Sequence, residues 1–147
     1  MQKAKPRIVL DTNVFLVSLA PQYKYHWIYQ YIIMGKFELC LTTEILLEYE
    51  EIISQRYGIE RVSGTLNYLL LLPNVLFFNP SYRWNLIEAD HDDNKFIDCY
   101  VAANADHIVG NDKHFNILKS IYFPSVNVLR YDEFEALYQR DISTETI

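Results

Sequence analysis

The sequence predicts an α/β fold in which a mainly parallel sheet of four to five strands lies between layers of helices, a three-layer arrangement. Short apolar runs alternate with longer segments of helical pattern along the whole chain, and this alternation is typical of parallel sheets with helical connections. The chain has 147 residues and only four glycines, so we expect one domain over residues 1–147 with short connections. Half of the residues are hydrophobic, which is enough for a buried core.

Each expected strand is a short apolar run that is closed by a polar or turn-forming residue. The strands are expected at 8–10, 37–41, 75–78, 107–109 and 126–129. Helices are expected where apolar residues recur with helical spacing between a polar start and a glycine or proline stop. They are placed at about 23–34, 43–57, 59–72, 92–104 and 132–140, with a brief helical turn over 111–118.

Charge and cysteine content exclude some classes of protein. The net charge is -6, so no broad cationic surface for nucleic acid is expected, and any such contact has to be local or made through a metal ion. Cys40 and Cys99 lie far apart among apolar neighbours, which favours buried, reduced thiols in a cytoplasmic protein. No apolar segment reaches the roughly 18 residues that a membrane span needs.

Four acidic residues are predicted to converge on one edge of the sheet. Asp11 and Asp112 directly follow the first and fourth strands, and ligands of such sheets bind at the carboxyl ends of the strands. Glu48 and Asp93 share helix faces with apolar residues three and four positions away, so both are expected to point inward. If the first and fourth strands are neighbours, all four carboxylates meet.

Each acid also has an ordinary structural explanation when it is considered alone. Glu48 could lie at the boundary of a buried face with its carboxylate in water. Asp93 stands in a first helical turn, where acids are common, and Asp112 belongs to a Gly-Asn-Asp turn. The metal-site interpretation therefore depends on the four acids occurring together.

Clustered carboxylates are most readily reconciled with a bound divalent cation, because they repel one another and lose water on burial. Oxygen ligands without His or Cys favour Mg²⁺ or Mn²⁺ over Zn²⁺. Such an ion can activate water for attack on a phosphodiester. The chain has no glycine-rich phosphate loop, no Ser–His pair and no reactive cysteine that would favour another chemistry.

Three segments carry a resemblance to a known family. They are IVLDTNVFL near the start, EYEEII in the third expected helix, and DHDDNKFIDCYVAANADHIVGND. With these segments the chain resembles PIN-domain proteins of the VapC-like branch, the toxin components of toxin–antitoxin pairs. The resemblance covers nearly the whole chain. It implies a Mg²⁺-dependent ribonuclease for single-stranded RNA, usually a homodimer, that a small antitoxin protein holds inactive.

The resemblance also implies roles for individual residues. The four metal-binding and catalytic acids of the family match Asp11, Glu48, Asp93 and Asp112. The residues expected to support them are Asn13, Asp98 and Asn111. One position departs from the family pattern, because Gly110 stands where a Ser or Thr is frequent. Threonine at this position would restore the hydroxyl.

Two lysines and two alternative functions complete the expectations. Lys95 and Lys113 lie within two residues of a site acid and are candidate contacts for substrate phosphates. Without the hydroxyl at position 110 the protein could instead be a binding module for RNA or a protein partner, with little or no cleavage. A phosphatase or phosphoacceptor with a nucleophilic aspartate is disfavoured, because the second acid of that pattern is replaced by Asn13.

Overall fold

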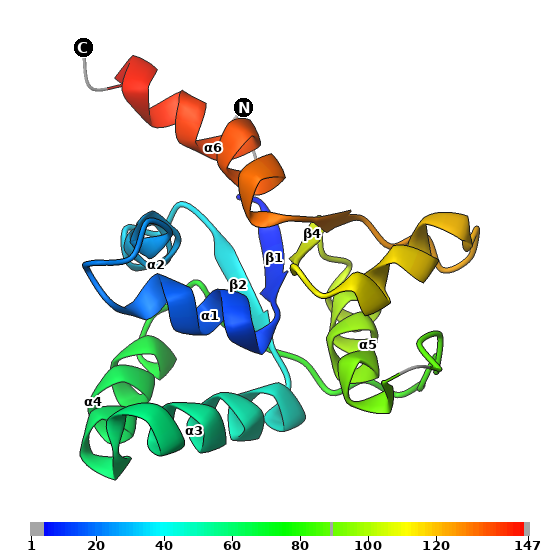
Figure 1. Cartoon of the computed structure of the whole chain (residues 1–147), viewed down its shortest axis with the longest axis horizontal. Coiled ribbons are helices and arrows are strands. Elements are labelled where there is room, and N and C mark those ends of the chain that lie inside the picture. The colour runs from blue at the N-terminus through cyan, green and yellow to red at the C-terminus, as the bar shows by residue number, and fades with distance from the viewer. Residues whose placement is uncertain (1–4, 89, 146–147) are drawn as a thin grey trace.

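The structure is a computed structural model that describes residues 5–88 and 90–145. Within these residues five parallel strands form one sheet (Figure 1), in the order β3-β2-β1-β4-β5. The strands are β1 (Arg7–Leu10), β2 (Glu38–Leu41), β3 (Val75–Phe77), β4 (His107–Val109) and β5 (Val128–Leu129). The expected fold class is confirmed, and each strand lies at its expected place to within one or two residues.

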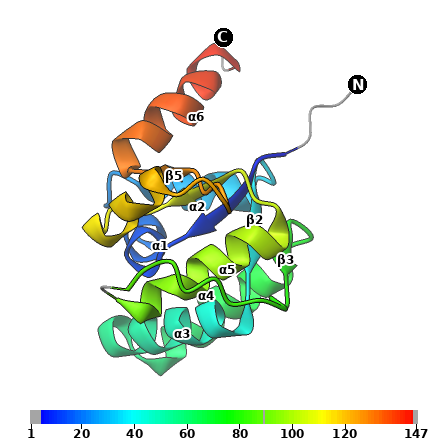
Figure 2. The same cartoon turned by 90° about the vertical axis from the view of Figure 1, so that its right-hand side faces the viewer.

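Helices cover both sides of this sheet. They are α1 (Thr12–Leu19), α2 (His26–Ile33), α3 (Thr43–Tyr57), α4 (Ile59–Leu70), α5 (Asn94–Ala103) and α6 (Tyr131–Glu145), with 3-10 helices η1 (His91–Asp93) and η2 (Lys113–Ser120). The strands β1 and β2 lie between α1 and α2 on one side and α5 on the other (Figures 1 and 2). No helix in the described ranges is both long and apolar enough to span a membrane.

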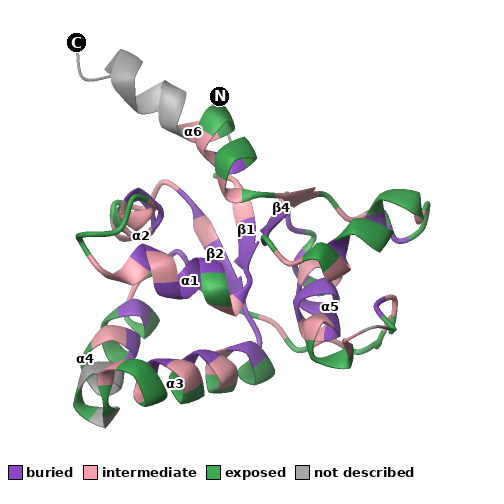
Figure 3. Cartoon of the chain, viewed as in Figure 1, coloured by how far each residue is buried: buried purple, intermediate pink, exposed green. Residues whose placement is uncertain are grey.

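The core is continuous across the sheet, as the buried strands in Figure 3 show. The three apolar residues of β1 are fully buried, which explains why they form an unbroken run, because a central parallel strand is covered on both faces. Aromatic side chains fill the space beneath α2 and α6. Trp27 and Phe37 both pack against Phe134, at ring-centroid distances of 5.5 and 5.3 Å.

Helix α1 is the one α-helix of the described chain that the sequence analysis did not assign. Its side chains are apolar almost all round, and Val14, Phe15 and Leu16 are all buried, so the sequence has no polar stripe that would indicate a helix. The starting signal is Asp11, which is the N-cap and accepts a hydrogen bond from the Val14 amide. The aspartate had been interpreted as a site residue, and it is also a cap.

Two other expected helices start later than predicted. The segment at 92–104 begins as the 3-10 turn η1 and becomes α-helical only at Asn94. Helix α2 starts at His26 instead of residue 23, because the chain before it forms turns after Pro21. Helix α3 begins at residue 43 as expected, and the Thr42 hydroxyl caps it by accepting a hydrogen bond from the Ile45 amide at 3.2 Å.

The strand order places a crevice beside β1. The chain passes from β1 to β2 on one side and later returns to β4 on the other, so β1 and β4 are neighbours. Leu10 is paired with Val109, and the Asp11 amide donates to the Val109 carbonyl at 3.0 Å. The loops that follow these strands therefore separate at this edge, where ligands of open α/β sheets bind.

Candidate metal centre

Asp11 directly follows β1, at the carboxyl end of the strand. Its side chain is 5% exposed, and its Oδ1 accepts the Val14 amide at 2.9 Å. Its Oδ2 faces the end of β4, because it lies only 3.1 Å from the point where a Cβ on Gly110 would stand. Oδ1 of Asp11 thus caps α1, whereas Oδ2 faces the end of β4 and takes no part in the cap.

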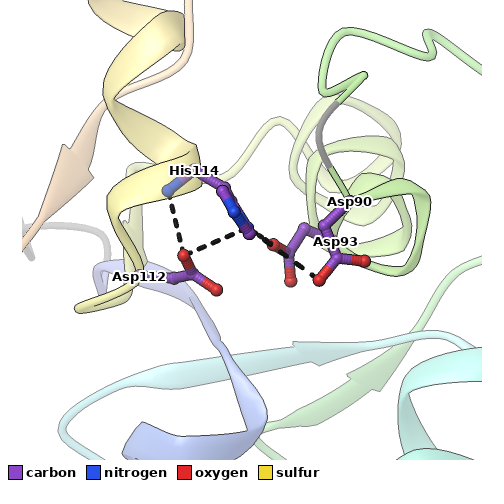
Figure 4. Close-up of side chains that lie close together, drawn as sticks. All are labelled: Asp90, Asp93, Asp112 and His114. Atoms are coloured by element: carbon purple, nitrogen blue, oxygen red, sulfur yellow. Dashed lines mark hydrogen bonds and ion pairs between the residues drawn. The ribbon is translucent and has the colours of Figure 1, made fainter.

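Three further acids and a histidine gather near this end of the sheet (Figure 4). Ligand atoms of Asp90, Asp93, Asp112 and His114 all lie within 4.8 Å of one another. The His114 Nδ1 is 3.2 Å from Asp112 Oδ1, 3.4 Å from Asp93 Oδ2 and 3.9 Å from Asp90 Oδ2. Two elements bring them together: η1 carries Asp93, with Asp90 as its N-cap, and Asp112 caps η2 by accepting the His114 amide at 2.9 Å.

The acids are close enough to change one another's protonation. Burial first, and then the charges of Asp93 and Asp112, raise the pKa of Asp11 from 3.8 to about 6, although the hydrogen bond from Val14 opposes the rise. Burial first, and then Asp112 and Asp90, raise the pKa of Asp93 to about 6, against the opposing effect of His114. Asp11 is therefore electrostatically part of the cluster although its side chain enters from β1.

The donor set fits a divalent cation. Three carboxylates and an imidazole converge on one point, and their repulsion in a partly buried site favours a positive charge between them. The cluster differs from the expected all-oxygen set, because His114 lies among the acids. Carboxylates suit Mg²⁺ and Mn²⁺, whereas an imidazole also suits other transition metals.

Glu48 lies beside the cluster and is held by other partners. Its Oε1 is 2.8 Å from Lys95 Nζ, and its Oε2 accepts a hydrogen bond from the Thr12 hydroxyl. Lys95 also donates to the Asp92 carbonyl at 2.8 Å. Glu48 thus points inward, as expected from its helix face. Its carboxylate contacts Lys95 and Thr12, the residue after Asp11, and is not one of the four clustered groups. Lys95, a candidate phosphate contact, is occupied by an ion pair.

The three expected supporting residues lie outside the cluster. Asp98 is buried and accepts the Trp84 amide at 3.0 Å, so it holds the loop after β3. The Asn111 side chain accepts the Tyr131 amide at 3.4 Å, which ties the loop after β4 to the start of α6. Asn13 is exposed in the first turn of α1.

Gly110 has no room for a side chain. A Cβ at this position would lie 2.9 Å from the Phe115 ring and 3.1 Å from the Asp11 carboxylate. Such distances require the neighbours to shift, and Phe115 is buried. The expectation that threonine could restore the hydroxyl is therefore wrong for this chain: the space near the end of β4 is occupied by the Phe115 ring.

Sequence reasoning missed two members of the cluster. Asp90 caps η1, since it accepts a hydrogen bond from the Asp92 amide at 3.1 Å, and its carboxylate also belongs to the cluster. His114 was not considered, although an Asp-x-His spacing at the end of a strand is a signal that could have found it. The 3-10 turns of η1 and η2 direct both residues toward the crevice.

A family comparison decides the classification. A family model described as a PIN domain matches residues 7–114, a range that includes all the strands except β5 and every residue of the cluster. The chain belongs to the PIN domain family. PIN domains are generally nucleases, and the acidic cluster is where the strand order places a binding site. No curated protein matches this PIN domain.

Solved structures show the same fold at low sequence identity. The PIN domain resembles a chain of the crystal structure of VapBC2 from Rickettsia felis bound to a DNA fragment from their promoter, with a TM-score of 0.59 and 14% identity over 86% of this chain and 99% of that chain. It also resembles the RRP44 PIN domain of T. brucei, with a TM-score of 0.51 and 13% identity over 98% of this chain and 88% of that chain.

Proposed function

We propose that this PIN domain is a divalent-metal-dependent endoribonuclease that hydrolyses phosphodiester bonds of single-stranded RNA. The observation that carries the proposal is the set of acids beside the ends of β1 and β4, where burial first and then the neighbouring negative charges raise the pKa values of Asp11 and Asp93 to about 6. A site that concentrates negative charge in a crevice favours a cation, and a cation in turn favours a phosphate. The resemblance to VapC-like PIN domains supplies RNA as the substrate class.

Each acid has a definite task in this proposal. Asp93, Asp112, Asp90 and His114 would hold the ion, and Asp11 would contribute from β1 through Oδ2, because Oδ1 is used by the helix cap. When bound, Mg²⁺ or Mn²⁺ polarises the phosphate and lowers the pKa of water.

Glu48 would join the site through Lys95. The Lys95 ammonium group reaches from α5 to Glu48 on α3 and pairs with its carboxylate, so Glu48 would stand beside the cation as an ion-paired residue and not as a fifth carboxylate ligand. Lys95 would hold the Glu48 side chain in this position. We propose that the four expected acids act together, with Glu48 in this indirect position.

The partners proposed are those of a toxin. A small antitoxin protein would hold the nuclease inactive, and the nuclease would form a homodimer in the cytoplasm, where the buried free thiols of Cys40 and Cys99 stay reduced. The fold that the chain shares with a VapBC2 structure supports this part of the proposal. A small reading frame adjoining the gene, whose product copurifies with this chain and stops its cleavage of RNA, is the expected finding.

Cleavage of a mixed single-stranded RNA tests the nuclease function. We expect cutting with Mg²⁺ or Mn²⁺, none with EDTA, and a loss of at least 100-fold in Asp93→Asn, since metal ligands act as a unit. Asp92→Asn is the matched control, because it makes the same change at the adjacent residue, whose side chain is exposed and outside the cluster.

Two results would contradict the proposal. Equal cleavage by the native protein and Asp93→Asn would remove the proposed site from the reaction. Absence of cleavage by the native protein with every metal would favour the binding-module alternative, in which the crevice recognises RNA or a protein without cutting it.

A further inference from the structure

We propose that a cationic cavity beside Asp112, between η2 and the start of α6, binds a backbone phosphate of the RNA next to the one that is cut. The cavity has a volume of about 230 Å³ and is reached from the same loop that carries Asp112. Its cationic side chains are Lys113, Lys119 and Arg130. The inference rests on the proposed function, because it takes RNA as the substrate.

The three cations are available for a ligand. Within residues 5–88 and 90–145, the side chains of Lys113, Lys119 and Arg130 make no ion pair, hydrogen bond or ring contact, and all three residues are exposed. Cations elsewhere are often engaged: Arg83 pairs with Glu44 at 2.7 Å, and Lys95 pairs with Glu48 at 2.8 Å. Three unengaged cations around one hollow are notable in a chain of net charge -6.

The acids of the cavity cancel only part of this charge. Asp112 and Glu133 also line the hollow, so three cationic side chains stand against two carboxylates and the lining keeps a net positive charge. Glu133 Oε1 accepts the Arg130 amide at 3.0 Å, which holds this carboxylate at the start of α6. Asp112 lies on the side of the cavity that faces the cluster, where a cation would neutralise it. The lining therefore changes from acidic at the proposed metal centre to basic toward Lys119 and Arg130.

The size of the hollow limits what it can hold. Pockets that enclose drug-sized ligands measure about 300–1,000 Å³, so a cavity of about 230 Å³ fits one phosphodiester unit. Its floor includes the buried ring of Phe115 and the side chain of Val128, and Asn116 offers an amide at the rim. Because Asp112 belongs both to the cavity lining and to the acidic cluster, a strand held in the cavity would lie next to the cluster.

Binding of a fluorescein-labelled single-stranded RNA in EDTA tests the cavity without requiring cleavage. Anisotropy titrations at several KCl concentrations should show that Lys119→Gln/Arg130→Gln lowers affinity by about tenfold and reduces the salt slope by about 0.7, since the cavity holds one phosphate and each single-strand phosphate contact contributes about 0.7. The variant Lys119→Arg/Arg130→Lys keeps the charge and should bind like the native protein.

The matched control removes two charges from parts of the molecule that do not line the cavity. Lys5→Gln/Arg56→Gln alters the segment before β1, at the amino end of the sheet, and the end of α3, and both residues are exposed. This control should change the RNA affinity by less than twofold. In cleavage assays the Lys119/Arg130 double variant should raise KM and leave kcat unchanged, because it removes binding away from the bond that breaks.

The outcomes separate this inference from the proposed function. If the protein cuts RNA but both double glutamine variants bind and cut equally well, the cavity is not a phosphate site, whereas the nuclease function stands. If the native protein cuts no RNA with any metal but binding depends on Lys119 and Arg130 as described, the cavity is supported and the nuclease function fails. Equal competition by poly-L-glutamate would overturn the assignment to RNA.

Discussion

Replacing Asp11 with asparagine should stabilise the metal-free protein. The carboxylate is 5% exposed, and its pKa is raised from 3.8 to about 6, mainly by burial. A difference of one pKa unit corresponds to about 1.4 kcal/mol, so the ionised group destabilises the folded state by about 3 kcal/mol above pH 6. Asparagine keeps an oxygen for the Val14 amide and carries no charge.

The raised pKa of Asp11 also predicts how the stabilisation by Asp11→Asn depends on pH. Because the pKa of Asp11 is higher in the folded chain than in the unfolded one, the folded protein takes up the proton first, and the penalty disappears as the pH falls from about 6 to below 3.8. The stabilisation of Asp11→Asn should therefore be full at pH 8, smaller at pH 5 and nearly absent at pH 3.8.

Thermal unfolding in EDTA measures the effect. For a chain of 147 residues, about 3 kcal/mol corresponds to a rise in Tm of roughly 6 to 12 °C at pH 8. Glu50→Gln is the control, because it removes one exposed charge from α3. Added Mn²⁺ should raise the Tm of the native protein more than that of the variant, because Asp11 contributes to the ion site.

Two results would refute the reasoning. If Asp11→Asn were no more stable than the native protein at pH 8 in EDTA, the buried carboxylate would not carry the proposed penalty. If the gain were the same at pH 8 and pH 4, its cause would not be the ionisation of Asp11.

Three further predictions concern neighbouring features. Gly110→Ala should lower stability by about 1–3 kcal/mol through overpacking, and adding Phe115→Leu to this variant should recover part of the loss. Denaturant titrations measure both effects, and an unchanged unfolding midpoint for Gly110→Ala would show that the Phe115 ring moves freely. Lys95→Met should leave Glu48 unpaired and tighten Mn²⁺ binding several-fold in calorimetry; weaker binding would mean that the lysine helps to build the site. Burial lowers the pKa of His107 from 6.5, so this residue contributes stability above pH 6.5 that is lost as the pH falls, and His107→Gln should lose less stability between pH 7 and 5 than the native protein does.

The sheet could be predicted because its signal is local. The central strands are buried on both faces, and each is an apolar run that ends at a polar residue, as Ile8, Val9 and Leu10 do before Asp11. Helix α3 could be predicted equally well, since it begins after a threonine cap and ends at a glycine. Helix α1 was not, because a helix covered on nearly all sides has no hydrophobic period to detect.

The site could be predicted only in outline. The edge of the sheet where Asp11 and Asp112 meet follows from a general rule about parallel sheets. The pairing of Glu48 with Lys95 depends on the distance between α3 and α5, which no local pattern contains. The position of the His114 ring among the acids depends on the 3-10 helix η2, because a shift of one residue along this helix would point the ring away from the cluster.

The close approach of the Phe115 ring to Gly110 should make substitutions at these two positions depend on each other among related proteins. The ring occupies volume that a side chain on the residue after β4 would need, and the Asp11 carboxylate borders the same volume. A relative cannot acquire a hydroxyl at the first position while it keeps a phenyl ring at the second. Family members with serine or threonine aligned to Gly110 are therefore expected to carry a smaller or displaced side chain aligned to Phe115, and substitution at the two positions should be correlated.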